Sequence, residues 1–156
     1  MSKKIKMFGA TPSPYTHKML SIFRYKHIGY EAFMGDAAGR LKKMNIDPPK
    51  PLLLPTILME NAEGDLIPTT DSTPIIRSLE EKYPDRKLLP EDPALSFVNY
   101  LLEDFGDEWV TKYMFHYRWY FKNNADNAGT MLPLVDIAVN TPEDTLIEFK
   151  KFIADR

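Results

Sequence analysis

The chain has 156 residues, of which 44% are hydrophobic and 27% charged, and its formal net charge is −2. This composition is typical of a soluble globular protein and excludes a disordered chain. The basic residues are scattered, so the clustered positive charge of a nucleic-acid-binding protein is missing. No segment approaches the length of a transmembrane helix, and the lysine-rich start lacks the apolar core of a signal peptide. We therefore expect a cytoplasmic protein that binds neither nucleic acid nor membrane.

Cysteine is absent from the sequence. Its absence excludes disulfides, a protein thiol nucleophile and cysteine-based metal sites. The three histidines, His17, His27 and His116, lack the spacing to paired carboxylates that zinc and iron sites require. We expect no bound metal, and any sulfur chemistry must use a thiol that a small molecule carries.

The first half of the chain predicts a small α/β domain. The expected elements are strands at 4–8, 30–34, 56–60 and 66–68, a helix at 16–28 and another from about 72 to 83. Gly64 lies between the last two strands, where a hairpin turn needs the positive φ that glycine tolerates. Residues 35–54 contain three prolines, which forbid a long regular element, so this stretch is expected to be irregular.

The second half has a helical pattern instead. Asp92-Pro93 is a strong helix start, because aspartate accepts hydrogen bonds at the N-cap and proline fits the first turn. Apolar residues then keep helical spacing over residues 94–105. An aromatic stretch at 109–121 continues this pattern, with Gly106 as an expected bend between the two.

The end of the chain predicts a loop and a last helix. Residues 123–133 have the composition of a loop, whereas Thr141-Pro142 starts a helix that continues to Arg156 without a glycine or proline stop. One stripe of this helix bears Leu146, Phe149, Lys150 and Ile153. The whole pattern indicates an α/β domain over residues 1–88 and an all-α region over residues 89–156.

The first candidate site is the segment Pro12-Ser13-Pro14-Tyr15-Thr16, between the first strand and the first helix. Ser13 can cap the helix while Pro14 occupies its first turn, so the positive end of the helix dipole lies beside the Ser13 hydroxyl. Such a place suits a thiolate: lowering a thiol pKa by about two units needs roughly 2.7 kcal/mol. A hydroxyl hydrogen bond and a helix N-terminus supply energies of this order. The alternative is that Ser13 and Pro14 only cap a helix.

Two further segments are candidate ligand-binding sites. Pro55 stands at the start of a strand, where a cis bond would expose the backbone of the preceding Leu54 to an extended ligand. Asp71 and Ser72 stand at the start of the next helix, where a serine hydroxyl and free N–H groups can hold a carboxylate. Asp71 can pair with a ligand ammonium. The alternative for this segment is again an ordinary helix cap.

Together these segments resemble the N-terminal domain of the glutathione S-transferase family, over roughly residues 4 to 92. Ser13-Pro14-Tyr15-Thr16 stands where glutaredoxins and omega-like transferases have Cys-Pro-Tyr/Phe-Cys or a relative of it. Residues 54–58 resemble the family's cis-proline segment, and Asp71-Ser72 resembles its Glu/Asp-Ser signature. Residues 82–93 resemble the linker to the family's helical domain. The resemblance implies a thioredoxin-like βαβ-ββα domain at 1–88, followed by a helical domain at 89–156.

The resemblance also implies roles for particular residues. Ser13 would stabilise the thiolate of glutathione, the implied co-substrate. The implied glutathione-binding residues are Ser13, Tyr15, Leu54, Pro55, Asp71 and Ser72. Lys50 is a speculative partner for the glycyl carboxylate. An apolar co-substrate pocket would use Trp109, Tyr113, His116 and Tyr117, although an aromatic stripe at this spacing is also typical of a helix core.

The implied function is conjugation of glutathione to a hydrophobic electrophile, as in detoxification. One alternative is a non-catalytic glutathione-binding or protein-interaction module of the same fold, and another is a structural fragment without a ligand. Because cysteine is absent, thiol–disulfide exchange through a protein mixed disulfide is excluded. The helical region is shorter than a complete family domain, which suggests a shortened or truncated chain. An incomplete bundle would expose apolar surface, so we expect a homodimer.

Overall fold

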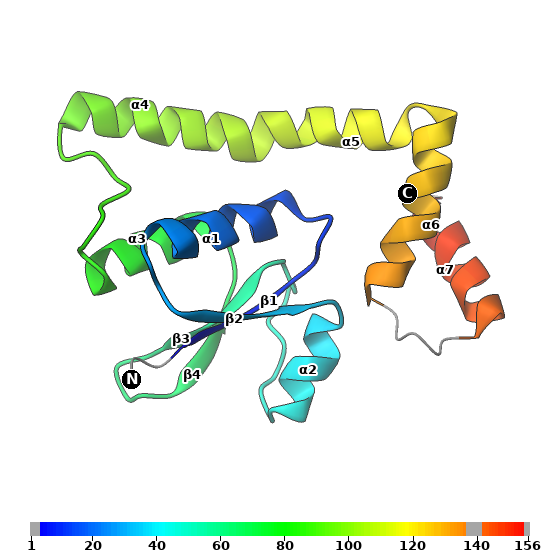
Figure 1. Cartoon of the computed structure of the whole chain (residues 1–156), viewed down its shortest axis with the longest axis horizontal. Helices are drawn as coiled ribbons and strands as arrows, with labels where there is room; N and C mark the ends of the chain where they lie inside the picture. The colour runs from blue at the N-terminus through cyan, green and yellow to red at the C-terminus, as the bar shows by residue number, and fades with distance from the viewer. Residues whose placement is uncertain (1–3, 137–141, 155–156) are drawn as a thin grey trace. The chain divides into compact units, whose positions relative to one another are not determined.

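The computed structural model describes residues 4–136 and 142–154. The chain divides into two compact units, Met1–Leu89 and Pro90–Arg156. Within the described residues, no helix combines the length and the apolar character needed to cross a membrane. Each unit is built from different elements, as Figure 1 shows.

The first unit is a four-stranded mixed sheet with three helices. Its elements are β1 (Ile5–Gly9), α1 (Pro14–Tyr25), β2 (Tyr30–Met34), α2 (Ala37–Lys43), β3 (Thr56–Glu60), β4 (Leu66–Thr69) and α3 (Ser72–Lys82). The strand order is β2-β1-β3-β4, with β1 parallel to β2 and the other pairs antiparallel. Helices α1 and α3 cover one face of the sheet and α2 the other (Figure 1). This is the thioredoxin-like arrangement that the sequence predicts.

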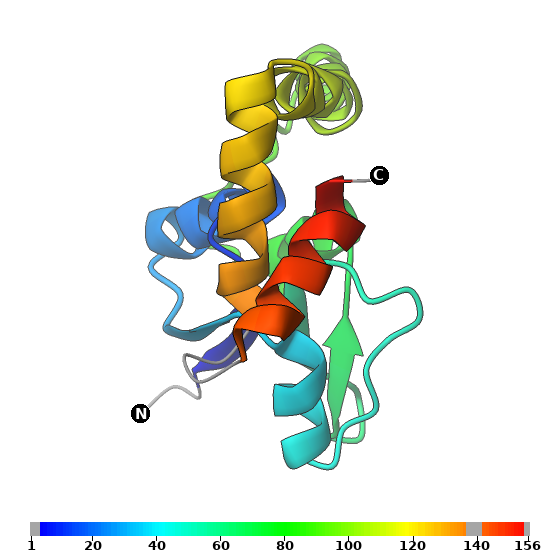
Figure 2. The same cartoon turned by 90° about the vertical axis from the view of Figure 1, so that its right-hand side faces the viewer.

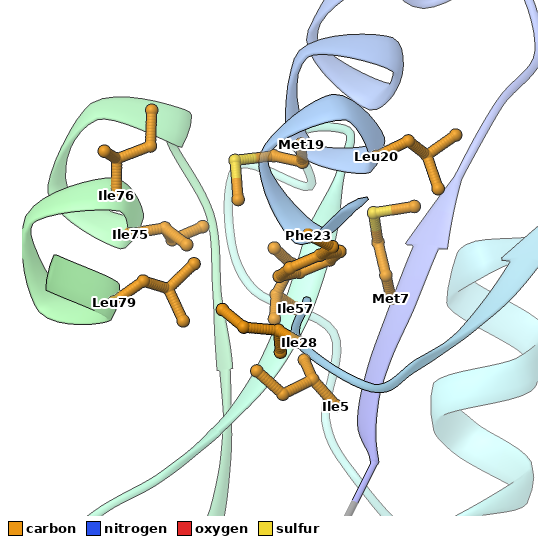
Figure 3. Packing of buried hydrophobic residues seen from close by; sticks show 10 residues of the cluster. All are labelled: Ile5, Met7, Met19, Leu20, Phe23, Ile28, Ile57, Ile75, Ile76 and Leu79. Atoms are coloured by element: carbon orange, nitrogen blue, oxygen red, sulfur yellow. The ribbon is translucent and has the colours of Figure 1, made fainter. Parts of the chain in front are cut away.

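The central strand β1 is buried on both faces, because helices lie on both sides of it. Met7 joins the cluster under α1 and α3, while its neighbour Phe8 points to the other face and packs with Leu41 of α2. Met7 is 0% exposed and Phe8 is 1% exposed. The larger cluster, shown in Figure 3, consists of Ile5, Met7, Met19, Leu20, Phe23, Ile28, Ile57, Ile75, Ile76 and Leu79.

A lysine is buried at the end of α1. Lys26 follows the last helical residue, and its side chain is 0% exposed. Its ammonium forms an ion pair with Glu80 of α3 and donates hydrogen bonds to the carbonyls of Asp85 and Arg86, both at 3.3 Å. A buried charge is tolerated only when it is paired and hydrogen-bonded, and here three acceptors surround the ammonium. Lys26 therefore connects α1, α3 and the segment that follows α3.

Glu80 completes the same network with its other oxygen. Oε2 accepts hydrogen bonds from the backbone N–H groups of Leu88 (3.0 Å) and Leu89 (3.3 Å). Desolvation by burial would raise the pKa of the Glu80 carboxyl, but the hydrogen bonds from Lys26, Leu89 and Leu88 together lower the pKa below its ordinary value. The carboxylate is therefore the form that the fold stabilises.

The stretch expected to be irregular contains one short helix, α2. Asp36 caps it by accepting a hydrogen bond from the backbone N–H of Gly39 at 3.0 Å. The prolines of this stretch all lie beyond the helix, so they do not interrupt its hydrogen bonds. The expectation of an irregular stretch is therefore wrong for residues 37–43, where Ala37 and Leu41 are buried against the sheet.

The second unit is helical, as predicted. Its elements are α4 (Pro93–Asp104), the π-helix η1 (Phe105–Val110), α5 (Thr111–Trp119), α6 (Lys122–Asp136) and α7 (Glu143–Ala154). Asp92 caps α4 by accepting from the backbone N–H of Leu95 at 2.9 Å. At Gly106, where we expected a bend, the backbone widens into η1, and α4 and α5 continue along one axis (Figure 1).

The expectation of a loop at residues 123–133 is wrong, because this stretch lies within α6. Lys122 and Asp126 form an ion pair of 2.8 Å one turn apart, which stabilises the start of the helix. Ala128 is buried, and Pro133 is fully buried although proline removes a helical hydrogen bond. Helix α7 lies alongside α6, as Figure 2 shows. Packing against a neighbouring helix therefore overrides the local preference of asparagine, glycine and proline for loops.

The last helix, α7, begins at Glu143. The N–H of Leu146 donates to the carbonyl of Pro142 at 3.2 Å, so Pro142 stands just before the first turn. Thr141 and Arg156, the expected start and end, lie outside the described residues, and the side chain of Ile153 is likewise not described.

Candidate functional site

Ser13 is the N-cap of α1. Its Oγ accepts a hydrogen bond from the N–H of Thr16 at 3.2 Å, and Pro14 occupies the first turn. A serine hydroxyl has one proton and two acceptor positions, so this bond leaves its proton for another acceptor. Among the described residues, none accepts that proton. The half-buried hydroxyl is thus a hydrogen-bond donor beside the positive end of a helix.

The loop that carries Ser13 is held from behind by Thr16. The Thr16 side chain is fully buried, and its Oγ1 accepts from the N–H of Ala10 at 3.2 Å. A Cβ at Gly9 would lie 2.6 Å from the Thr16 methyl group, so a larger residue at Gly9 would displace it. His17 Nε2 lies 2.7 Å from the carbonyl oxygen of Thr11. Thr16, which sequence reasoning left without a clear role, therefore fixes the shape of the loop.

The register of the sheet brings three segments to one edge. Phe8 of β1 pairs with Thr56 of β3, so the end of β1 lies beside the start of β3. Ile57 of β3 pairs with Thr69 of β4, so the end of β4 lies there too. The loop before α1, the Leu54–Pro55 segment and the start of α3 continue from these three strand ends. The sheet therefore places the three predicted segments at the same edge.

The Leu54–Pro55 peptide bond is cis, and so is Lys50–Pro51. Pro55 is buried, and the Leu54 side chain packs against the cluster around Phe8. The Thr56 hydroxyl donates to the carbonyl of Leu53 at 2.8 Å. No described residue forms a hydrogen bond with the Leu54 backbone. This backbone therefore has a donor and an acceptor to offer at the sheet edge.

Asp71 and Ser72 begin α3. Asp71 accepts from the N–H of Thr73 at 3.1 Å, and its φ is +73°, a value that non-glycine residues rarely adopt. Such backbone strain costs on the order of 1–3 kcal/mol and is typical of functional sites. Ser72 is only 5% exposed, and its Oγ accepts a hydrogen bond from Lys18 Nζ at 3.1 Å. Lys18 belongs to α1, so this bond connects the two helix starts directly.

Sequence reasoning missed Lys18. Its sequence neighbourhood shows only a lysine beside the apolar stripe of α1, which is typical of a solvated side chain. The contact with Ser72 joins residues 54 positions apart in the chain. Only the packing of α1 beside α3 reveals it.

The residues predicted for a co-substrate pocket all lie on η1 and α5, in the second unit. Trp109, Tyr113 and Tyr117 are 52%, 52% and 62% exposed, and His116 is also exposed. Their contacts are with residues nearby in the chain: Lys112 lies 4.4 Å from the Trp109 ring centroid, and the His116 ring stacks on Tyr120 with centroids 4.7 Å apart. These four side chains therefore lie on the exposed surface of η1 and α5. Of the other predicted residues, Tyr15 is half-buried in the first turn of α1 and Lys50 is exposed.

A cavity of about 460 Å³ lies at the opposite edge of the sheet. It is lined by residues at the start of β1, the end of β3, the start of β4 and the end of α3. Its rim carries both charges, with Lys82 Nζ 3.9 Å from a Glu60 oxygen. This cavity does not include any predicted site residue, so it is separate from the edge described above.

The sequence of the first unit matches a known protein family. Residues 7–87 match the family model described as glutathione S-transferase, N-terminal domain. No protein of curated function matches the sequence significantly.

Solved structures share the fold at low sequence identity. A glutathione S-transferase from Methylobacterium radiotolerans JCM 2831, in complex with glutathione sulfonate, is 19% identical with a TM-score of 0.55, covering 98% of this chain and 63% of that one. One from Rhodospirillum rubrum F11 is 21% identical with a TM-score of 0.57, covering 95% and 60%. Glutathione transferase Omega 1C from Trametes versicolor is 12% identical with a TM-score of 0.58, covering 97% and 69%.

The chain spans about three fifths of the length of the two bacterial transferases. The family match includes the loop before α1, the Leu54–Pro55 segment and the start of α3, and it extends over more than half of the chain. The chain therefore belongs to the glutathione S-transferase family.

Proposed function

We propose that this chain binds glutathione at the sheet edge where α1, the Leu54–Pro55 segment and α3 begin, and conjugates its thiolate to a hydrophobic electrophile. One observation carries the proposal. Two serine hydroxyls at this edge, on Ser13 and Ser72, each accept a hydrogen bond from the protein, which directs their protons towards a ligand. Two such donors at two helix N-termini suit a ligand with anionic groups at separate points.

Ser13 is the proposed stabiliser of the thiolate. The N–H of Thr16 occupies one acceptor position of its hydroxyl, which polarises the O–H bond towards the sulfur. The backbone of Leu54 would bond the cysteinyl part of the tripeptide, while Asp71 and Ser72 hold the γ-glutamyl end. The proposed glutathione-binding residues are Ser13, Tyr15, Leu54, Pro55, Asp71 and Ser72.

The reaction is a nucleophilic substitution. The thiol proton leaves to solvent, the sulfur donates an electron pair to the electrophilic carbon, and the leaving group departs with the electrons of its bond. The protein contributes position and stabilisation of the sulfur anion. Aromatic residues of the second unit, Trp109, Tyr113, His116 and Tyr117, are the proposed contacts of the apolar co-substrate.

A second candidate function is glutathione binding without turnover. The observation that favours it is the exposure of three of the proposed co-substrate residues, Trp109, Tyr113 and Tyr117, each of which is more than half exposed. A protein of this kind would keep the glutathione site and lack a shaped site for an electrophile. Turnover separates the two functions, because both require the same site for glutathione.

Thermal unfolding with glutathione tests the binding proposal. At 100 times its dissociation constant a ligand stabilises the folded state by about 2.7 kcal/mol, so we expect the Tm to rise with glutathione concentration. The control ligand is the isomer with an α-linked glutamate, which has the same charge and composition but a different backbone. An equal shift with both peptides, or no shift with glutathione, would refute a specific site. If glutathione binds, conjugation of an aryl halide then supports the enzyme, and its absence supports the binding module.

We also propose that the chain self-associates through the apolar side of α4. Leu95, Val98 and Leu102 lie on one face of this helix and are 60%, 48% and 65% exposed, although such side chains are usually buried. Exposed apolar patches of this kind are typical of protein interfaces. Sedimentation velocity should show a dimer that dissociates in the Leu102→Glu variant, whereas Lys151→Glu on α7 should leave the dimer intact. A monomer at high concentration would contradict the proposal.

A further inference from the structure

We propose that the cavity at the opposite edge of the sheet, where Lys6 and Glu31 lie side by side, binds an α-amino acid with a large apolar side chain. This inference is independent of the proposed glutathione site, because the cavity contains none of the residues assigned to that site. Its volume of about 460 Å³ lies within the range of about 300–1,000 Å³ that is typical of small-molecule sites.

The cavity lies where the sheet divides into two pairs of strands. β1 and β3 pair at Met7–Ile57 and Phe8–Thr56, and at no other position within the described residues. Towards its start β1 pairs only with β2, and towards its end β3 pairs only with β4. The two pairs of strands therefore separate at this edge, and the cavity is lined by the start of β1 and the end of β3.

Both faces of the sheet supply apolar side chains to this cavity. Ile5 belongs to the buried cluster under α1 and α3, and Met59 and Tyr83 pack against that cluster. Leu58 belongs to the cluster on the α2 face of the sheet, and Leu66 packs against it. These walls suit a large apolar group, because removing apolar surface from water is favourable in proportion to the area buried.

A cation and an anion that line the cavity are neighbours on adjacent strands. Lys6 of β1 is directly opposite Glu31 of β2 in the parallel register, so both side chains lie on the same face of the sheet, on strands about 4.8 Å apart. Neither side chain forms an ion pair or a hydrogen bond with another described residue. The other two charges are already close together, with Lys82 Nζ 3.9 Å from a Glu60 oxygen. Lys6 and Glu31 are therefore the charges that a ligand can pair with.

These two charges decide the class of ligand. An apolar ligand with a single negative charge would pair with Lys6 and bring that charge close to Glu31, which repels it. A ligand with a single positive charge would have the converse problem with Lys6. An α-amino acid carries an ammonium and a carboxylate on one carbon, so it can pair with Glu31 and Lys6 at once while its side chain enters the apolar part of the cavity.

Titration of the whole chain with phenylalanine, followed by NMR of the Met59 ε-methyl group, tests the proposal. The methyl resonance should shift saturably, because Met59 lines the cavity. Three analogues each lack one feature of phenylalanine: 3-phenylpropanoate has no ammonium, phenethylamine has no carboxylate, and alanine has no large apolar group. We expect the first two to bind about 10-fold more weakly than phenylalanine, because each loses one charge-assisted contact. Alanine should cause no shift.

Two substitutions should reproduce the differences between these ligands. Lys6→Met should weaken the binding of phenylalanine and 3-phenylpropanoate about 10-fold and should not weaken that of phenethylamine. Glu31→Gln should weaken the binding of phenylalanine and phenethylamine and should not weaken that of 3-phenylpropanoate. The matched controls are Lys151→Met and Glu108→Gln, which change exposed charges in the second unit.

Three outcomes would overturn the proposal. Without a saturable shift of the Met59 methyl resonance, phenylalanine does not bind in the cavity. Equal affinities for phenylalanine and 3-phenylpropanoate would show that the ammonium is not recognised. An equal loss of all three aromatic ligands in Lys6→Met would mean that Lys6 only shapes the cavity. Because the comparison of ligands uses the wild-type chain, it decides the proposal even if a variant does not fold.

Discussion

Replacing Lys26 with methionine is expected to lower the free energy of unfolding by about 3 kcal/mol. The Lys26 side chain is 0% exposed and the Glu80 side chain is 12% exposed, so the substitution leaves a carboxylate in the protein interior without its cation. Breaking a buried ion pair in this way costs about 3–5 kcal/mol. We expect the lower end, because Glu80 keeps the N–H groups of Leu88 and Leu89 and some contact with water. Urea unfolding at pH 7 measures the change.

Three comparisons make this prediction specific. Lys122→Met removes the exposed ion pair with Asp126, and we expect it to lower the free energy of unfolding far less than Lys26→Met does. The double variant Lys26→Met with Glu80→Met should recover part of the loss, because two apolar side chains replace the charged pair. A double variant as unstable as Lys26→Met would show that the lost hydrogen bonds to the backbone matter more than the unpaired charge.

Acid pH gives the third comparison. The folded-state pKa of Glu80 lies below its ordinary value of 4.5, so its stabilising effect is present above pH 4.5 and is lost as the pH falls through the folded-state pKa. The difference in stability between the wild type and Lys26→Met should therefore narrow below pH 4.5. A difference that stays constant down to pH 3 would mean that Lys26 acts through packing alone.

Replacing Ser13 with alanine is expected to lower kcat/KM for conjugation of glutathione to an aryl halide by about 10- to 100-fold. The substitution removes one hydrogen bond to an anion, which contributes about 1.5–3 kcal/mol. The bound thiol should then ionise about one to two pH units higher, because each pH unit corresponds to about 1.4 kcal/mol. The pH dependence of kcat/KM and the ultraviolet absorbance of the bound thiolate both report this change.

Variants at the same position separate chemistry from helix capping. Alanine at an N-cap costs about 1 kcal/mol of stability, whereas glycine costs only a few tenths. Ser13→Gly should therefore be nearly as stable as the wild type and as inactive as Ser13→Ala. Ser13→Thr keeps a hydroxyl and should keep most of the activity, and the exposed Ser78→Ala should keep all of it. Full activity in Ser13→Ala would remove Ser13 from the mechanism.

Local chemistry made several elements predictable from the sequence. Residues 30–34 and 56–60 form strands with the expected bounds, because turn residues flank both β2 and β3. The start of α4 was also predictable, since an aspartate N-cap and a proline in the first turn affect only backbone groups within a few residues of them. The three candidate segments at Ser13, Pro55 and Asp71 were found for the same reason: each consists of capping or proline residues beside a predicted element.

Other features depend on contacts between distant residues. Asparagine, glycine and proline predicted a loop at 123–133, but α6 forms there because it packs along α7. The stretch before the prolines of residues 48–51 was expected to be irregular, and α2 forms there because the sheet face around Phe8 buries Leu41. In both stretches, the burial of apolar surface outweighs weak local preferences.

By itself the sequence determined the α/β pattern, the helical second half and the candidate segments, because these depend on periodicity and on residues near one another in the chain. Only the tertiary structure decided that strand register gathers the three segments at one edge. It also decided that Lys18 meets Ser72 and that Lys26 meets Glu80, each across 54 positions. The physical reason is that the packing of α1 beside α3 sets which polar side chains meet, and the local sequence pattern carries no information on such pairs.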